Sequence, residues 1–248
     1  MKKLIKFKMT KNIIALALVI ISLVSCDTKE NENSNLHLTG NIKGLSQGKL
    51  YIQQIKDSSL VVLDSMVIKG DSKFESYLTI ESPEMLYLFL DRGQTNSIDN
   101  NLPFFAEPGH MNIETTLNSF FADAKITGSK NHDLYIEFTK MKSKFNDKNM
   151  DLVEKELENL QIKDKNNLDS ISSEANKLTR KKYLYIANFA TTHADKEIAP
   201  FLSLSEIADI NVRYLDTIDS KMNPHVAKSK YGMMLKSYIQ ERKKLETK

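Results

Sequence analysis

Between Leu36 and about Gly128, apolar and polar residues mostly alternate, and this period of two is typical of half-buried β-strands. In the first segment, Leu36, Leu38 and Ile42 alternate with polar residues. Glycine, proline and other turn residues divide the region into seven or eight such segments. The pattern predicts an antiparallel sheet or sandwich over residues 36–128.

One turn in this region predicts a particular pairing. Val61–Ile68 and Lys73–Ile80 flank Gly70-Asp71, and glycine accepts the positive φ angle that a tight hairpin needs. We therefore expect these two segments to form a β-hairpin. In the second arm, Phe74, Leu78 and Ile80 share one face.

After Gly128 the apolar period changes to 3.6 residues, which is typical of amphipathic helices. Leu134, Phe138, Met141 and Phe145 share one helical face, and Val153, Leu157 and Leu160 repeat the pattern. A longer helix is predicted over Asn166–Thr192, and Asn223-Pro224 fits the start of the last helix because proline is tolerated in a first turn. A helical domain over residues 129–248 after a β-domain makes the predicted fold class α+β. None of these expected helices is apolar on all sides, so none is expected to span a membrane.

The N-terminal residues have the pattern of a secretory signal peptide. Residues 1–11 are basic, and Ile13–Val24 is a 12-residue apolar run, shorter than the ~20 residues of a spanning helix. This signal peptide, residues 1–25, ends in Leu23-Val24-Ser25-Cys26, which resembles a bacterial lipobox. Cleavage between Ser25 and Cys26 would leave Cys26 as a lipidated first residue, and two or more acyl chains anchor a protein stably. The alternative is an ordinary signal peptide with a chance cysteine. Residues 26–35 are polar and predict a solvated tether.

The charge balance argues against a nucleic-acid partner. The formal net charge is +3, but residues 1–25 hold five lysines and no acidic residue. The remainder therefore has 30 basic against 32 acidic residues, a net charge of about −2. Cys26 is the only cysteine, which excludes an internal disulfide, a CxxC pair and a cysteine-rich zinc site.

Candidate catalytic patterns have simpler structural explanations. Gly44-Leu45-Ser46-Gln47-Gly48 matches G-x-S-x-G, but a strand follows it and β-α alternation is missing, so we interpret it as a hairpin turn. Lys181-Lys182 beside Tyr183 and Tyr185 is interpreted as a basic, solvated helix face with tyrosines packing inward. The loop acids and the histidines carry no motif spacing, so no catalytic, cofactor-binding or metal-binding residue is predicted. The loop acids are Asp91, Asp99 and Glu107, and the histidines are His37, His110, His132, His193 and His225.

Several short segments together carry a family resemblance. They are Leu38–Leu45, Gly48–Ile52, Leu63–Ser65, Gly70–Phe74, Glu107–Gly109 and Thr127–Asn131. In this order they resemble the N-terminal β-rich domain of unknown function found in bacterial lipoproteins that end in a TlpA/ResA-like thioredoxin domain of the AhpC/TSA superfamily. The resemblance covers about residues 36–145. The helical part is similar to the connector of those proteins, notably Ser229–Gly232 and the final helix.

The redox activity of those relatives does not carry over, because no residue here matches their CxxC motif and this chain stops at Lys248. The chain is then either a natural stand-alone form or a truncated relative. The first expectation is a lipid-anchored envelope protein, on the periplasmic or surface side, that acts as a binding or interaction module without catalysis. The alternative is an accessory or scaffold of a thiol-disulfide exchange system with a thioredoxin-like partner. A cysteine-independent enzyme is a third hypothesis, which needs a pocket with converging acids or histidines. Asp91–Asn101 is the loop expected to matter for partner binding.

Overall fold

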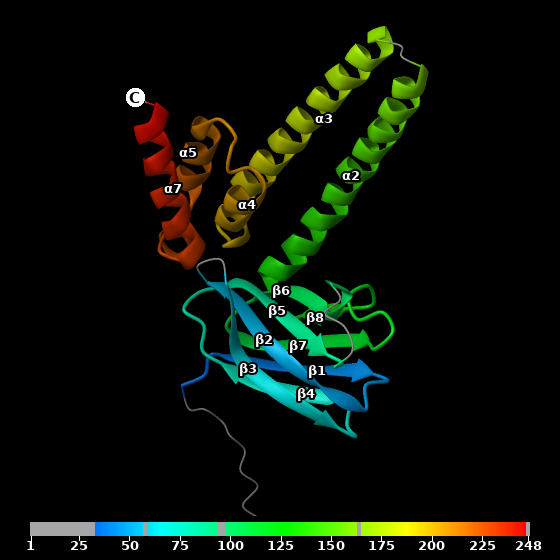
Figure 1. Ribbon diagram of the computed structural model, residues 1–248. Helices are drawn as coiled ribbons and strands as arrows, with labels where there is room; N and C mark the ends of the chain where they lie inside the picture. Colours follow the sequence, from blue (N-terminus) through cyan, green and yellow to red (C-terminus); the bar gives the residue numbers. More distant parts are fainter. Residues whose placement is uncertain (1–32, 57–58, 94–97, 163–164, 247–248) are drawn as a thin grey trace, which may run out of the picture. The chain divides into compact units, whose positions relative to one another are not determined.

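The computed structural model describes residues 33–56, 59–93, 98–162 and 165–246 (Figure 1). Residues 33–248 form one unit by their contacts, and the account below concerns that unit. All the strands precede the long helices along the chain, so the predicted α+β fold class is confirmed. The predicted signal peptide and Cys26 lie outside the described residues.

Within the described residues, eight strands form two four-stranded sheets. In spatial order, sheet A consists of β4 (Lys73–Leu78), β1 (Leu36–Lys43), β7 (Gly109–Thr116) and β8 (Lys125–Thr127). Sheet B consists of β3 (Ser59–Lys69), β2 (Gln47–Lys56), β5 (Glu84–Asp91) and β6 (Asn101–Ala106), which a short 3-10 helix, η1 (Ile98–Asn100), precedes. The strand pairs are antiparallel except β1 with β7, which run parallel. The parallel pair joins the first strand to one about 70 residues later, which local periodicity does not reveal.

The two sheets share one apolar core. Leu36, Leu38 and Ile42 of β1 are fully buried, as the alternating pattern predicts. Leu50 and Ile52 of β2 meet them from the other sheet. Fully burying a leucine or isoleucine contributes about 1.5–3 kcal/mol, so this alternation supplies much of the stability of the β-region.

The predicted hairpin around Gly70-Asp71 is wrong. β3 pairs with β2 in sheet B, and β4 pairs with β1 in sheet A, so the turn carries the chain from one sheet to the other. Gly70 has a φ angle of 85°, which a tight change of direction needs whether or not the flanking strands pair. Phe74, Leu78 and Ile80 are all buried, so their predicted shared apolar face is confirmed.

In the part of the chain that the structure describes, six helices follow the strands, and the first two make an antiparallel hairpin (Figure 1). They are α2 (Lys130–Ile162), α3 (Lys165–Thr192), α4 (Ile198–Glu206), α5 (Val212–Lys221), α6 (Pro224–Ala227) and α7 (Lys230–Glu246). The predicted helix over Asn166–Thr192 is confirmed as α3. Asn223-Pro224 begins the one-turn helix α6 rather than the last helix, because the Asn223 side chain caps the Val226 N–H and α7 starts separately at Lys230. None of the helices in the described ranges combines the length and apolar character of a membrane-crossing segment.

Sheet B is buried on both faces near β6. Its inner face carries Leu86 and Leu88 into the core between the sheets. On the outer face, Met85 and Phe105 belong to the core of the helical part. The ring of Phe105 lies edge-on to Phe201 of α4, with 5.5 Å between ring centroids. The helices therefore dock on the outer face of β5 and β6.

A buried polar network holds the start of α2 against the β-region. The Glu107 carboxylate accepts hydrogen bonds from the backbone N–H groups of Lys130 and Asn131, each at 2.9 Å, and so caps α2. The Asn131 amide donates to Glu107 and to Glu197, and its oxygen accepts from Ile198 N–H at 2.8 Å. One asparagine therefore ties a sheet turn, α2 and α4 together.

A second polar contact fixes the start of α7. The buried Glu84 carboxylate binds Lys230 Nζ and accepts from Gln54 Nε2 at 2.5 Å. The adjacent Tyr231 hydroxyl accepts from Met85 N–H at 3.1 Å, and burial raises the pKa of that hydroxyl. The acid of β5 thus has both a charged and a neutral partner, which offsets the cost of burying it.

A buried histidine belongs to the same junction. His132 is 3% exposed, and its Nδ1 accepts a hydrogen bond from Phe105 N–H at 3.3 Å. Burial lowers the pKa of His132 to about 4, and nearby Asp133 opposes this shift only weakly. The fold therefore holds this imidazole neutral.

This pKa predicts a pH dependence of stability. Between pH 6.5 and about 4 the unfolded chain binds a proton at His132 that the folded chain does not. The free energy of unfolding should therefore fall as the pH decreases through this window, by up to about 3 kcal/mol. Urea titrations at pH 7 and pH 5 should show a smaller loss for His132→Gln than for the wild type. An equal loss in both proteins would contradict the assignment.

Candidate interaction surface

The outer face of sheet B follows from the strand register. Leu50 and Ile52 of β2 point into the core, so Tyr51, Gln53 and Ile55 point outward. Opposite residues on neighbouring strands share a face. The outward residues opposite these on β3 are therefore Ser65, Val62 and Leu60, and those on β5 are Phe89 and Tyr87.

Part of this outer face is left open. The exposed fractions are 48% for Ile55, 55% for Leu60, 48% for Val62 and 58% for Val67. Tyr51 and Phe89 are half-buried, and their rings lie 6.3 Å apart between centroids. We call these six residues the open face: Tyr51, Ile55, Leu60, Val62, Val67 and Phe89. It continues, on the same sheet surface, the area that the helices cover at Met85 and Phe105.

The strand β3 is exposed beyond the open face as well. Leu60-Val61-Val62-Leu63 is a run of four apolar residues that are each between 38% and 55% exposed. β3 is also the last strand of sheet B, so within the described residues it has a hydrogen-bonded strand on one side only. Long apolar edge strands invite pairing with other chains, and natural proteins usually protect them.

A hollow of about 720 Å³ lies at the other end of β2 and β3. Val67 of the open face lines it together with Lys49, Lys69, Asp91 and Arg92. The open face therefore runs from an apolar end to a charged end. The loop Asp91–Asn101 starts at this hollow, where the Asp91 carboxylate accepts from Gly93 N–H at 2.8 Å. Residues 94–97 of that loop lie outside the described residues.

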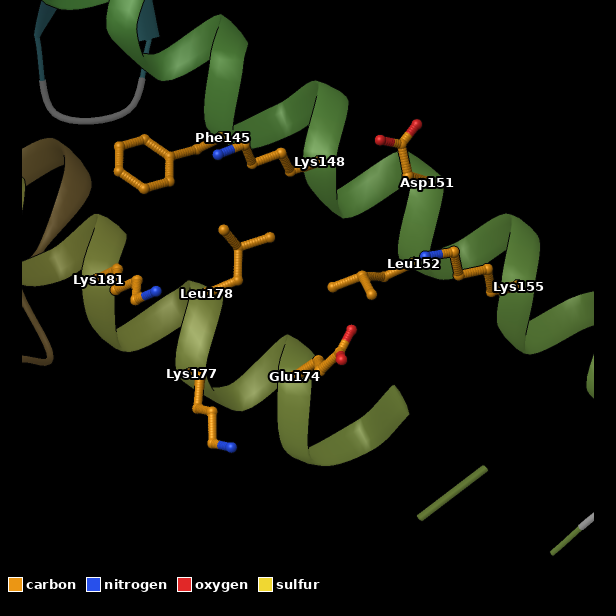
Figure 2. Close-up of a pocket in the computed structure, with 9 residues that line it drawn as sticks. All are labelled: Phe145, Lys148, Asp151, Leu152, Lys155, Glu174, Lys177, Leu178 and Lys181. Atoms are coloured by element: carbon orange, nitrogen blue, oxygen red, sulfur yellow. The ribbon is translucent and has the colours of Figure 1, made fainter. Parts of the chain in front are cut away.

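A separate groove lies between α2 and α3 and measures about 490 Å³ (Figure 2). Phe145, Leu152 and Leu178 provide its apolar lining. Its charged residues are Lys148, Asp151, Lys155, Glu174, Lys177 and Lys181. The groove mixes both signs of charge with three apolar side chains, and this lining does not select one class of ligand.

Val153, Leu157 and Leu160 continue the apolar helical period of α2, but their side chains are not buried. Their exposed fractions are 38%, 58% and 53%, and Met150 beside them is 64% exposed. α2 contacts α3 instead through a different face, on which Leu152 and Asn159 are buried. The repeat correctly predicts a helix, but the helix has more apolar surface than its neighbour covers.

The structure brings His37 and His110 together, which the sequence did not predict. They are directly opposite in the parallel β1–β7 pair, with 5.0 Å between ring centroids on the exposed face of sheet A. His37 also stacks on Tyr77 and shares a 2.7 Å contact with Glu75. Among the described residues no group of three or more histidines and acids has a metal-binding arrangement. The remaining histidines are dispersed over the helical part.

The structure also shows the positions of the other candidate residues named from the sequence. Gly44 adopts a φ angle of 91° in the turn between β1 and β2, so the segment is a turn as interpreted. Its interpretation as a hairpin is wrong, because β1 lies in sheet A and β2 in sheet B and the two strands do not pair. Tyr183 and Tyr185 pack against the helical core, as the pattern indicated, and Lys181 is exposed whereas Lys182 is half-buried. Glu107 caps α2, whereas Asp91 belongs to the hollow. Ser25 and Cys26 lie outside the described residues.

Comparison with known protein families adds one finding. Residues 36–135 match the model of DUF4369, a domain of unknown function. The matched range includes all eight strands and the first residues of α2, so it contains both sheets and the open face. The predicted N-terminal domain of unknown function is thereby confirmed. The chain matches none of the curated proteins.

Substitutions on the open face test whether it is an accessible apolar surface. Because Leu60 and Val62 are about half exposed, changing both to threonine should alter the free energy of unfolding by less than about 1 kcal/mol. The same change should reduce binding of a hydrophobic dye such as ANS. The control is Leu88→Ala in the buried core, which should cost about 2–5 kcal/mol. Unchanged dye binding by a stable double variant would show that the open face is not an accessible apolar surface.

Proposed function

We propose that the protein is a lipid-anchored interaction module of a bacterial cell envelope. In this proposal the lipid on Cys26 holds the chain at a membrane, and the open face of sheet B binds an envelope protein. The chain itself performs no catalysis. The observation that carries the proposal is the half-exposed apolar surface of Ile55, Leu60, Val62 and Val67.

The open face has the composition of a protein-binding surface. Its centre carries aliphatic and aromatic side chains, including Tyr51 and Phe89. Its end at the hollow carries Lys49, Asp91 and Arg92. An apolar centre with a polar border is typical of sites where proteins dock.

The helices support the same role because they hold part of the sheet in place. Phe105 and Tyr231 lie 6.1 Å apart between ring centroids, and Glu84 binds Lys230 beneath them. Sheet B is thus rigid at the β6 side, while β2 and β3 remain available. A rigid exposed sheet face binds a partner with little loss of conformational entropy.

The N-terminal residues support the proposed anchor. The basic segment, the apolar run and the lone cysteine stand in the order that lipoprotein processing needs. The chain then holds Asp27–Asn35 between the lipid and β1. Asn35 is already fixed at the end of β4, because its backbone N–H donates to the Leu78 oxygen at 3.0 Å. Its side chain also bonds both the oxygen and the N–H of Ile80, just after β4, at 2.7 and 2.9 Å. The Asn33 carbonyl also accepts a hydrogen bond from the Thr79 hydroxyl at 3.0 Å, so the chain is bound to the β-region at Asn33 as well.

Lipidation has a direct test. Cells grown with a clickable palmitate analogue should label the wild-type protein and leave Cys26→Ala unlabelled. Thr28→Ala changes a neighbouring position without removing the thiol and should be labelled like the wild type. Label on the Cys26→Ala protein would contradict the anchor.

Partner binding is tested by mild cross-linking in cells, extraction of the full-length protein and mass spectrometry of what is attached. Lysine at Ile55 or at Val67 should remove a specific envelope protein from the wild-type set, because burying an unpaired charge in the docking surface is costly. Met233→Lys is the matched control, since Met233 of α7 is 57% exposed and lies outside the open face. Recovery of a thioredoxin-like protein would favour the role of an accessory in thiol-disulfide exchange. An identical set of proteins with all three variants would refute docking at the open face.

A further inference from the structure

The edge of β3 has two different halves. In the half that follows Leu63, the Asp64 carboxylate lies on the inner side of the sheet and accepts from the Ser76 hydroxyl of β4 at 2.5 Å. The register with β2 also shifts at this point, because Ile52 and Gln53 face Asp64 and Val62 and leave Leu63 as an extra residue. An inward charge and a β-bulge are two devices that discourage pairing at an edge. They protect Asp64–Lys69.

The half Ser59–Leu63 has no inward charge, and the bulge affects only its last residue, Leu63. It contains no charged residue, and its four apolar side chains are exposed on both faces of the sheet. Leu60 and Val62 belong to the outer face, and Val61, opposite Gln54, belongs to the inner one. Side chains exposed on both faces indicate that this half-strand lies beyond the cover of sheet A. The backbone groups on its outer edge have no strand to bond within the described residues.

We infer that a second copy of this chain pairs with Ser59–Leu63, antiparallel, about a two-fold axis at Val61. This proposal goes beyond the proposed function and concerns the strand edge rather than the sheet face. The two copies of sheet B would then form one continuous eight-stranded sheet. The outer faces of both copies would lie on the same side of it.

The sequence of the half-strand favours a second copy as the occupant. An axis at Val61 places it opposite Val61 of the other copy, and places Leu60 opposite Val62. Apolar residues therefore face apolar residues at the three central positions, Ser59 faces Leu63 at the two ends, and no charge becomes buried. Because Leu60, Val61 and Val62 make this segment apolar on both faces, a second copy of the same segment complements it better than a strand of alternating polar and apolar residues.

The arrangement also has a consequence for the open face. Leu60 and Val62 of both copies would become neighbours at the centre of the joined sheet. The two open faces would merge into one apolar surface with a hollow at each distant end. A partner protein would then meet a surface twice as long as that of one chain.

Engineered cysteines test the pairing in the full-length protein in its membranes. In the mature chain Cys26 is the only native cysteine and would be lipidated, so a new thiol reports on its own position. With Val61→Cys, the two thiols lie next to the axis, within the 4.4–6.8 Å between Cα atoms that a disulfide needs. Val67→Cys is the control, because Val67 is 58% exposed but would lie roughly 40 Å from its counterpart at about 3.4 Å per residue.

After mild oxidation, the disulfide-linked dimer should be roughly tenfold more abundant for Val61→Cys than for Val67→Cys. Sedimentation of the detergent-solubilised wild type should give a dimer that Val61→Lys converts to a monomer and Val67→Lys leaves intact. Equal cross-linking of both cysteine variants, a monomeric wild type, or a disulfide from Val61→Cys to a different protein would overturn the inference. Because Ile55 and Val67 lie outside Ser59–Leu63, loss of the partner in their variants is a separate result.

Discussion

The docking of the helices on β5 and β6 is the contact on which the rest of this structure depends. At this place sheet B is buried on both sides, with Leu86 and Leu88 against sheet A and Phe105 against α4 and α7. The helices stop short of β2 and β3, whose outward residues stay open. One sheet face is therefore divided into a covered part and an exposed part, and this division defines the candidate interaction surface.

Polar groups determine where the division lies. Apolar side chains alone would allow the helices to slide along the face, because dispersion and burial are not directional. Glu107, Asn131 and Glu84 have hydrogen-bond partners that only one position of α2, α4 and α7 can satisfy. A shift toward β3 would leave buried carboxylates without partners, which costs several kcal/mol. The buried network thus contributes to the uniqueness of the arrangement more than to net stability.

The sequence predicted whether each element is a strand or a helix better than it predicted which elements pair. Alternation identified the strands, and the change to a period of 3.6 located the start of the helical region within two residues of Lys130. Neither pattern states which strands pair. Gly70 marks a sharp turn equally well in a hairpin and between two sheets, and only the tertiary contacts distinguish these cases. The parallel pairing of β1 with β7, which places His37 opposite His110, likewise could not be predicted from the local pattern.

The candidate surface was predictable only in part. The run Leu60-Val61-Val62-Leu63 breaks the alternation, and four consecutive apolar residues in a strand signal either burial on both faces or an unusual exposure. Only the position of β3 at the sheet edge distinguishes burial on both faces from exposure. The same holds for Val153 and Leu157, whose spacing predicts an apolar helix face but not the partner that covers it.

Hydroxyl-radical footprinting of the protein in its native membranes tests the central claim most directly. Leu60 and Leu157 are the same residue type with exposed fractions of 55% and 58%, so their oxidation rates in the isolated chain should be similar. If the open face and the β3 edge are docking surfaces, oxidation of Leu60 and Val62 should be strongly reduced in membranes relative to dilute purified protein, while oxidation of Leu157 changes little. Equal oxidation of Leu60 in both states would contradict the assignment of this surface to binding.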